Sequence, residues 1–166
     1  MVSPDALRAA MGKFATGVAI VTTLSPDGAP HGMTANALTS VSLEPPLVLV
    51  CISHLRNTYG YVQARRRFGV NFLAQGQADI ARYFARDPAE RLGDVHVPWQ
   101  MGGDGSPRIA GAIAFMECLV AALHHHGDHA IVVAQVQEAV VEGGKPLLYY
   151  ERQLWGMDSG VPAEGV

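Results

Sequence analysis

Residues 113–140 decide the fold, and they read IAFMECLVAALHHH (113–126), GD (127–128) and HAIVVAQVQEAV (129–140). Both longer segments are rich in residues that favour β-strands. Gly127-Asp128 between them is a dipeptide typical of a tight turn. The stretch therefore predicts two long antiparallel strands joined by a two-residue reversal.

Apolar runs separated by turns continue on both sides of this hairpin. We expect strands over residues 17–24, over a segment carrying His31 and Met33 after the turn at 25–28, over 46–52, over 68–73, and over 147–150 with an extension through 151–155. Residues 46–52 are apolar throughout, which predicts burial on both faces of that strand. Helices are expected over 4–14 with Ser3 as the cap, over 59–66 and over 76–85.

The pattern of elements favours a mainly β fold with inserted helices. The chain has no Gly-x-Gly-x-x-Gly after a strand and no regular βαβ alternation, which argues against a Rossmann domain. A closed antiparallel β-barrel fits the hairpin spacing better. We expect one domain over residues 1–156 and a flexible Gly/Pro-rich tail over 157–166. Residues 87–105 are the most loop-like segment, where Trp99 either packs on the core or covers a ligand.

A polar stretch leads into the apolar run at 46–52. Its small hydrogen-bonding side chains are Thr34, Asn36, Thr39, Ser40 and Ser42. Neighbouring alanines leave room for a flat heteroaromatic ring to approach the backbone. Neutral N–H and O–H donors can bind ring carbonyls or a phosphate. The composition fits a polar ligand loop, and it fits an ordinary Ser/Thr-rich turn equally well.

The order of residues in this stretch resembles the flavin-binding segment of the short-chain flavin reductases. These NAD(P)H:flavin oxidoreductases supply reduced flavin to two-component monooxygenases. The resemblance rests on HGMTANA (31–37), TSVSL (39–43) and PPLVLVC (45–51), and more weakly on FGVNFL (68–73), GDH (127–129) and PLLYY (146–150). It covers nearly the whole chain. It implies a split β-barrel of Greek-key type, FMN or FAD as cofactor, NADH or NADPH as co-substrate, a homodimer and a separate monooxygenase partner.

The resemblance also implies a set of cofactor-binding residues: Met33, Thr34, Ala35, Asn36, Ala37, Thr39, Ser40, Cys51, Ser53, Arg56, Asn57 and Thr58. The last three stand at a predicted helix start, where side chains and free backbone N–H groups together suit a phosphate. Plain helix capping explains the same residues. The segment His54-Leu55-Arg56-Asn57 departs from the family's usual form, in which a serine, arginine or threonine is common.

Four histidines gather at the tip of the predicted hairpin. Adjacent side chains of a strand point to opposite faces, so His124, His125 and His126 cannot all face one metal ion. No carboxylate or cysteine is spaced to complete a site with His124 and His126, and we expect no metal. In the family that Gly127-Asp128-His129 resembles, the histidine stands beside the nicotinamide or the flavin edge. A surface turn residue is the alternative for His129.

No acid, base or nucleophile pattern stands out in the chain, so we assign no catalytic residue. Hydride transfer between nicotinamide and flavin needs none, because it is the cofactors' own chemistry. A non-catalytic flavin- or haem-binding module on the same barrel is one alternative. A pyridoxamine 5′-phosphate oxidase-like flavoenzyme is another, although the chain lacks an obvious basic pocket for a second phosphorylated substrate.

Composition limits the remaining possibilities. A formal net charge of −3 without a basic block gives no electrostatic reason to expect nucleic acid or an anionic membrane as partner. No apolar run approaches the roughly 20 residues that span a bilayer, and the amino terminus lacks a secretory pattern. We therefore expect a cytoplasmic protein. Cys51 and Cys118 lie in apolar strand-like runs, which favours buried free thiols over a disulfide.

Overall fold

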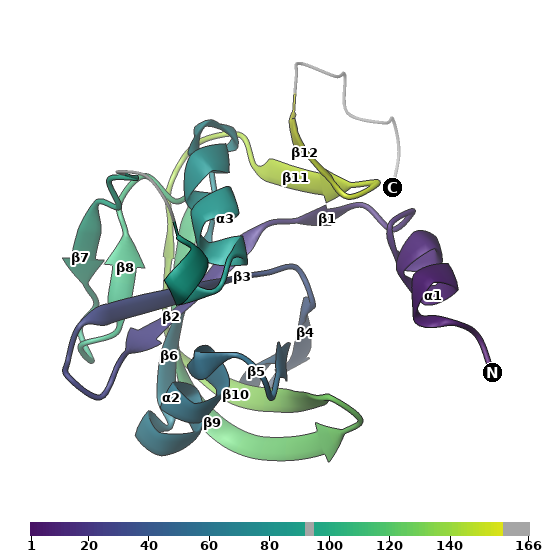
Figure 1. Ribbon diagram of the computed structural model, residues 1–166. Coiled ribbons are helices and arrows are strands. Elements are labelled where there is room, and N and C mark those ends of the chain that lie inside the picture. The colour runs from purple at the N-terminus through teal and green to yellow at the C-terminus, as the bar shows by residue number, and fades with distance from the viewer. Residues whose placement is uncertain (92–94, 158–166) are drawn as a thin grey trace.

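One antiparallel sheet carries most of the structure (Figure 1). The computed structural model describes residues 1–91 and 95–157. Seven of the described strands pair in the order β3-β2-β6-β9-β10-β5-β4, and every neighbouring pair is antiparallel. The strands are β2 (Ala19–Leu24), β3 (Pro30–Ala35), β4 (Leu38–Leu43), β5 (Pro46–Ser53), β6 (Arg67–Phe72), β9 (Ala114–His126) and β10 (His129–Val141).

β9 and β10 form the predicted hairpin at the centre of this sheet. His126 pairs with His129 across the turn, and Gly127 has a φ of 58°, which a glycine adopts without strain. The register shifts between Val133 and Ala134, and again further along β10, so the hairpin contains bulges. Bulges bend a strand pair and increase its twist, so they help the hairpin to follow a curved sheet.

The sheet is strongly curved, because its two edge strands are consecutive in the chain. β3 ends at Ala35 and β4 begins at Leu38, so only Asn36 and Ala37 join the two edges. A flat sheet of seven strands would hold its edges about 29 Å apart, whereas three Cα–Cα steps span at most about 11 Å. The strands therefore wrap around a core that includes Val21, Val50, Ile52, Phe68, Val70 and Val132.

A mainly β fold with inserted helices is thereby confirmed. No ladder of hydrogen bonds joins β3 to β4 among the described strand pairs. The prediction that the barrel is closed is therefore not confirmed by the strand pairing. The edges approach at the Asn36-Ala37 corner, where the backbone N–H of Cys51 in β5 donates to the carbonyl oxygen of Ala37 at 3.0 Å.

A second, three-stranded sheet crosses the end of the first. It consists of β1 (Thr16–Gly17), β11 (Leu147–Tyr150) and β12 (Gln153–Gly156) in the order β1-β11-β12. The predicted extension of β11 through 151–155 is wrong, because the chain reverses at Glu151-Arg152. Both residues are left-handed, with φ of 49° and 64°. Such turns normally carry glycine or asparagine, so the sequence pattern concealed this one.

The three predicted helices are present with adjusted ends. They are α1 (Pro4–Met11), α2 (Asn57–Arg65) and α3 (Ala78–Ala85), and a 3₁₀ turn η1 (Gln75–Gln77) precedes α3. Ser3 caps α1 by accepting a hydrogen bond from the N–H of Ala6. Ile80 and Phe84 of α3 pack in a second core cluster with Val18 and Leu147. In contrast, α1 stands away from the large sheet in Figure 1, and none of its residues is buried.

Three further expectations need correction. β5 was expected to be buried on both faces, but after Pro46 its residues alternate between half-buried and buried. The strands β4 and β10 pair with its two edges, and its outer face stays accessible. The expected polar loop is mostly strand: Thr39, Ser40 and Ser42 lie on edge strand β4, where polar side chains face water. The 87–105 segment contains a 3₁₀ turn η2 (Pro88–Glu90) and strand β7 (Trp99–Met101), which pairs with β8 (Pro107–Ile109).

Trp99 packs against the second core cluster. Its ring lies edge-on to Phe84 with 5.8 Å between centroids, which favours the packing interpretation over a ligand cover. Residues 158–166 of the expected tail lie outside the described residues. Among the helices of the described ranges, none is long and apolar enough to cross a membrane.

Candidate functional site

Three cavities meet at Asn36, the corner between the two edge strands. The central cavity, of about 190 Å³, lies between the corner, the end of β5 and the start of β10. The α3 cavity, of about 600 Å³, lies between β3, α3 and the β11–β12 hairpin. The α1 groove, of about 510 Å³, runs between α1 and the outer face of β4 and β5. Asn36 lines all three, so ligands held in neighbouring cavities would touch.

The central cavity gathers residues that are far apart in the sequence. β3 and the corner supply five of them, β5 supplies Cys51 and Ser53, and the start of β10 supplies His129. The predicted site residues that line it are Met33, Thr34, Ala35, Asn36, Ala37, Cys51, Ser53, Arg56 and His129, together with Ala85, which was not predicted. Ser53 and His129 are brought together because β5 and β10 pair with these two residues opposite each other.

Four of the predicted residues lie elsewhere. Thr39 lines the α1 groove, and Ser40 is exposed on β4 and lines none of the three cavities. Asn57 borders a small cleft beside Arg56. Thr58 is buried, and its Oγ1 lies 2.9 Å from Nε2 of His31. The hydroxyl of Thr58 is therefore already engaged with the protein.

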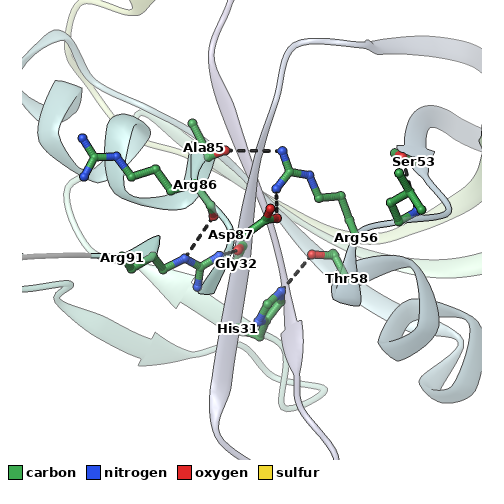
Figure 2. A network of polar contacts seen from close by, with 10 residues as sticks. His31, Gly32, Ser53, Arg56, Thr58, Ala85, Arg86, Asp87 and Arg91 are labelled. Atoms are coloured by element: carbon green, nitrogen blue, oxygen red, sulfur yellow. Dashed lines mark hydrogen bonds and ion pairs between the residues drawn. The ribbon is translucent and has the colours of Figure 1, made fainter. Parts of the chain in front are cut away.

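Arg56 brings a positive charge to the start of α2. It occupies the N-cap position without a side-chain cap, so the first-turn N–H groups of α2 have no side-chain acceptor there. Its guanidinium forms an ion pair with Asp87, and its Nη2 lies 3.5 Å from the carbonyl oxygen of Ala85 (Figure 2). Both partners of the ion pair are partly exposed. A guanidinium at a helix N-terminus is well suited to bind a phosphate. In this structure the carboxylate of Asp87 occupies the place beside Arg56 that such a phosphate would take.

Beside Arg56 lies a network of polar contacts that includes His31, Thr58 and Arg91 (Figure 2). Burial and, to a smaller extent, the nearby positive charge of Arg91 together lower the pKa of His31 to about 4, so the ring is neutral at pH 7. Arg91 donates to the carbonyl oxygen of Gly32 at 2.8 Å and to that of Arg86 at 3.3 Å (Figure 2). The network fixes the start of α2 and the segment after α3 to β3. The sequence placed His31 only in a strand and gave no signal of this role.

His129 stands at the rim of the central cavity. Its Nδ1 lies 2.8 Å from Oδ1 of Asp128, and this hydrogen bond lowers the pKa of the Asp128 carboxyl. His54 and His125 lie beside the same turn, with 3.3 Å between Nε2 and Nδ1, and the N–H of His54 donates to the carbonyl oxygen of Asp128 at 3.0 Å. In the part of the chain that the structure describes, no three metal-binding side chains come together. Among the described histidines of the hairpin tip, His129 is thus the one that lines the central cavity.

The α3 cavity contains residues that the sequence analysis missed. Tyr149, Arg152, Gln153 and Leu154 reach it from the β11–β12 hairpin, and Arg82 and Ala85 reach it from α3. Arg152 was missed because residues 151–155 were expected to continue a strand. Arg82 was expected only as one residue of an amphipathic helix.

The residues around Asn36 fit a flavin. Ala35 and Ala37 present only methyl groups to the cavities, which admits a flat ring close to the backbone. Among the described residues, the N–H groups of Asn36 and Ala37 donate to no protein acceptor. Two free backbone donors beside a wall of small side chains suit the oxygen and nitrogen atoms on a flavin edge. Arg56 at the far side of the same cavity suits its phosphate.

Comparisons with known proteins relate most of the chain to one family. Residues 11–157 match the family described as flavin reductase like domain. The chain is 41% identical, over 86% of its length and 75% of the relative, to the reductase component of the 4-nitrophenol 4-monooxygenase/4-nitrocatechol 2-monooxygenase of Rhodococcus opacus. It is 40% identical, over 90% of its length and 84% of the relative, to an NADH-dependent flavin reductase of a Rhodococcus species. It spans only 42% of a probable flavin reductase of Rhizobium meliloti, at 41% identity.

Solved structures show the same fold. The NADH:FAD oxidoreductase of Streptomyces globisporus, in complex with NAD and FAD fragments, superimposes with a TM-score of 0.84 at 35% identity and 99% coverage of both chains. A flavin reductase in its native state gives a TM-score of 0.87 at 35% identity over 95% of this chain and all of the other. The match over residues 11–157 and these similarities establish that the chain belongs to the flavin reductase-like domain family.

Proposed function

We propose that the protein reduces FMN or FAD with NADH or NADPH and supplies the reduced flavin to a separate monooxygenase. The observation that carries the proposal is the central cavity, where eight of the twelve flavin-site residues expected from the sequence line one space beside free backbone donors. The relatives of the chain include NADH-dependent flavin reductases and a reductase component of a monooxygenase.

The chain's own residues serve to bind and to orient in this proposal. When bound, the flavin accepts a hydride from the reduced nicotinamide through chemistry that belongs to the two rings. The backbone at Ala35–Ala37 holds one ring face close, and Asn36 and Ala37 donate hydrogen bonds toward its edge. Arg56 neutralises the phosphate, and His129 positions the nicotinamide at the open side. Short and fixed contact between the two rings is the main requirement of such a reaction.

We also propose that the protein is a homodimer with the flavin site at the subunit boundary. The apolar side chains of the α1 segment face water in the single chain: Leu7 is 59% exposed, Met11 58% and Phe14 66%. Met11 and Phe14 also line the α1 groove, which adjoins Asn36 and Cys51. A second subunit packed here would cover these side chains and complete one wall of the site.

Two finer statements belong to the same proposal. The curved sheet, with its edges joined by two residues, supports the split-barrel fold that the sequence resemblance implies. A cytoplasmic location is supported by Cys51 and Cys118, which are both free thiols, since reducing compartments keep cysteines unpaired.

Steady-state turnover tests the proposed activity. Purified protein is mixed with NADH and FMN under air, and the absorbance of the reduced nicotinamide is followed. We expect oxidation of NADH that requires both protein and flavin. A protein that binds flavin but leaves NADH unoxidised would instead be a non-catalytic flavin module. The Asn36→Leu variant serves as the site-directed control, and it should lose turnover together with flavin affinity.

A further inference from the structure

Among the described residues, two arginines and no carboxylate line the α3 cavity, which gives it a positive charge. Its volume of about 600 Å³ lies in the range of small-molecule sites. Arg82 and Arg152 line it from opposite elements, α3 and the β11–β12 turn, and no carboxylate lines it. Asn36, Tyr149 and Gln153 add neutral hydrogen-bonding groups. Two positive charges with no negative charge between them favour an anionic ligand.

The two arginines are available to such a ligand. Arg152 makes no hydrogen bond or ion pair with any other residue in the described ranges. Arg82 pairs with Asp79 one turn earlier at 2.9 Å, but both side chains are well exposed, at 61% and 84%. Exposed pairs of this kind contribute little, so a phosphate would displace Asp79 at small cost.

The turn that carries Arg152 is braced on both sides. Glu151 forms an ion pair with Lys13, and its N–H donates to the carbonyl oxygen of Gly12 at 2.8 Å, which fixes the turn to the end of α1. On the other side, Nε1 of Trp155 donates to the carbonyl oxygen of Tyr150 at 3.1 Å. The guanidinium therefore starts from a fixed point on the cavity rim.

The backbone at Arg152 is one where glycine would be favoured. Its φ of 64° lies in the left-handed region, which costs a residue with a side chain about 1–2 kcal/mol. Folding alone gives no reason for an arginine here. Strained positions of this kind are common at ligand sites, where the side chain has a task that offsets the strain.

The position of the cavity indicates which anion it receives. The flavin phosphate has its own cation, Arg56, at the start of α2 on the far side of Asn36. The α3 cavity shares Thr34, Ala35 and Asn36 with the central cavity, so a molecule held in it would adjoin the flavin ring. A second dinucleotide with its own phosphates fits this arrangement.

We propose that Arg82 and Arg152 bind the diphosphate of the reduced nicotinamide nucleotide in the α3 cavity. The proposal rests on the proposed function and adds to it the residues that hold the co-substrate. The diphosphate of FAD is chemically the same group, and the experiment below separates the two sources.

Binding of ADP-ribose to the purified protein, measured by calorimetry, tests the proposal without turnover. ADP-ribose carries the diphosphate but no nicotinamide or flavin. We expect Arg152→Gln to weaken its binding about 5- to 30-fold, because one charge-assisted hydrogen bond is lost. Arg82→Gln should weaken it by a similar factor, whereas Arg152→Lys should stay within about 3-fold of the wild type because the charge remains. Arg65→Gln, at an exposed arginine on α2, is the matched control and should change nothing.

Arg152→Gly guards against misfolding, because glycine suits the left-handed backbone. It should fold as well as the wild type and still lose ADP-ribose affinity. The dissociation constants of FMN and FAD and the Michaelis constant for NADH complete the test. The proposal expects the NADH constant to rise with both flavin constants unchanged. Weaker FAD binding, with an unchanged FMN dissociation constant and an unchanged Michaelis constant for NADH, would assign the cavity to the flavin and overturn the proposal. Unchanged ADP-ribose affinity in the arginine variants would also overturn the proposal. Absent turnover in a wild type that binds ADP-ribose would count against the proposed function alone.

Discussion

Nε2 of His31 in β3 lies 2.9 Å from Oγ1 of Thr58 in the first turn of α2. This contact joins the edge strand that supplies Met33, Thr34 and Ala35 to the helix whose start carries Arg56. Tyr61 of the same helix packs edge-on to the His31 ring with 5.0 Å between centroids. The contact thus sets the distance between the ring-binding and phosphate-binding parts of the proposed flavin site.

The stability of the protein should depend on the protonation of His31. Its pKa is about 4 in the folded protein against 6.5 in a free side chain, so the unfolded state binds more protons between these values. Stability is complete above about pH 6.5 and falls as pH falls toward 4. We expect a loss of about 1–2 kcal/mol from this residue, reduced from the full shift by partial contact with water.

Urea unfolding of the wild type and of His31→Asn across this pH range isolates that contribution. Asparagine keeps a hydrogen-bonding group near Thr58 but does not titrate. The stability difference, wild type minus variant, should decrease as pH falls from about 6.5 to 4. A difference that stays constant over this range would show that His31 is not the group responsible.

Asn36→Leu should weaken flavin binding by roughly 5- to 150-fold, equivalent to about 1–3 kcal/mol for a lost hydrogen bond at a buried polar ligand atom. Stability should change little, because the Asn36 amide makes only one hydrogen bond to the described protein, to Thr16 at 3.3 Å. Fluorescence titration with FMN and a thermal melt measure both effects. Gln63→Leu, on the exposed side of α2, is the control. Full flavin affinity in Asn36→Leu would place the ring elsewhere.

Ser40 gives a sharper test of how far the flavin extends along β4. The sequence resemblance assigns it to the cofactor, yet in the single chain it is exposed outside the three cavities. If the flavin tail or the partner subunit reaches β4, Ser40→Glu should weaken flavin binding through charge repulsion. An unchanged dissociation constant would remove Ser40 from the site while leaving Asn36 in it.

His129→Ala should raise the Michaelis constant for the reduced nicotinamide by roughly 5- to 30-fold, about 1–2 kcal/mol, with flavin affinity nearly unchanged. The expected role is contact with the nicotinamide and no proton transfer. His126→Ala is the matched control, because His126 is the cross-strand neighbour at the same hairpin tip. A lower melting temperature together with disturbed binding of both substrates would show that His129 serves the turn.

Sedimentation of the wild type should give a dimer at micromolar concentration, and Leu7→Glu combined with Phe14→Glu should shift it toward a monomer. Both side chains are well exposed in the single chain, so the charges cost little in an isolated subunit and disrupt only a contact between subunits. Ala9→Glu, at an exposed position of α1 that does not line the α1 groove, is the control for charge alone. A wild-type monomer that retains activity would contradict the proposed subunit boundary.

Local patterns predicted much of this fold, and the limits of the prediction have physical causes. The β9–β10 hairpin and the Ser3-capped α1 depend on neighbouring residues, so the sequence alone revealed them. The turn at Glu151-Arg152 did not follow from the sequence, because its left-handed residues are neither glycine nor asparagine. Consequently the arginine that lines the α3 cavity was missed.

The candidate site likewise contains residues that local sequence predicted and contacts that it did not. Residues 33–37 were predicted because they are contiguous and belong to one motif. The pairing of Ser53 with His129 follows from strand register, and the engagement of Thr58 by His31 follows from packing between β3 and α2. Both depend on contacts between segments that are distant in the chain, which no local pattern reports.

Anaerobic mixing of the purified protein with NADH and FMN shows whether the protein catalyses hydride transfer to flavin. The absorbance of NADH and that of oxidised flavin are followed together. We expect one flavin to be reduced for each NADH consumed, at a rate that is proportional to protein concentration and saturates with both substrates. A rate no faster than that of the same mixture without protein would contradict the proposed function.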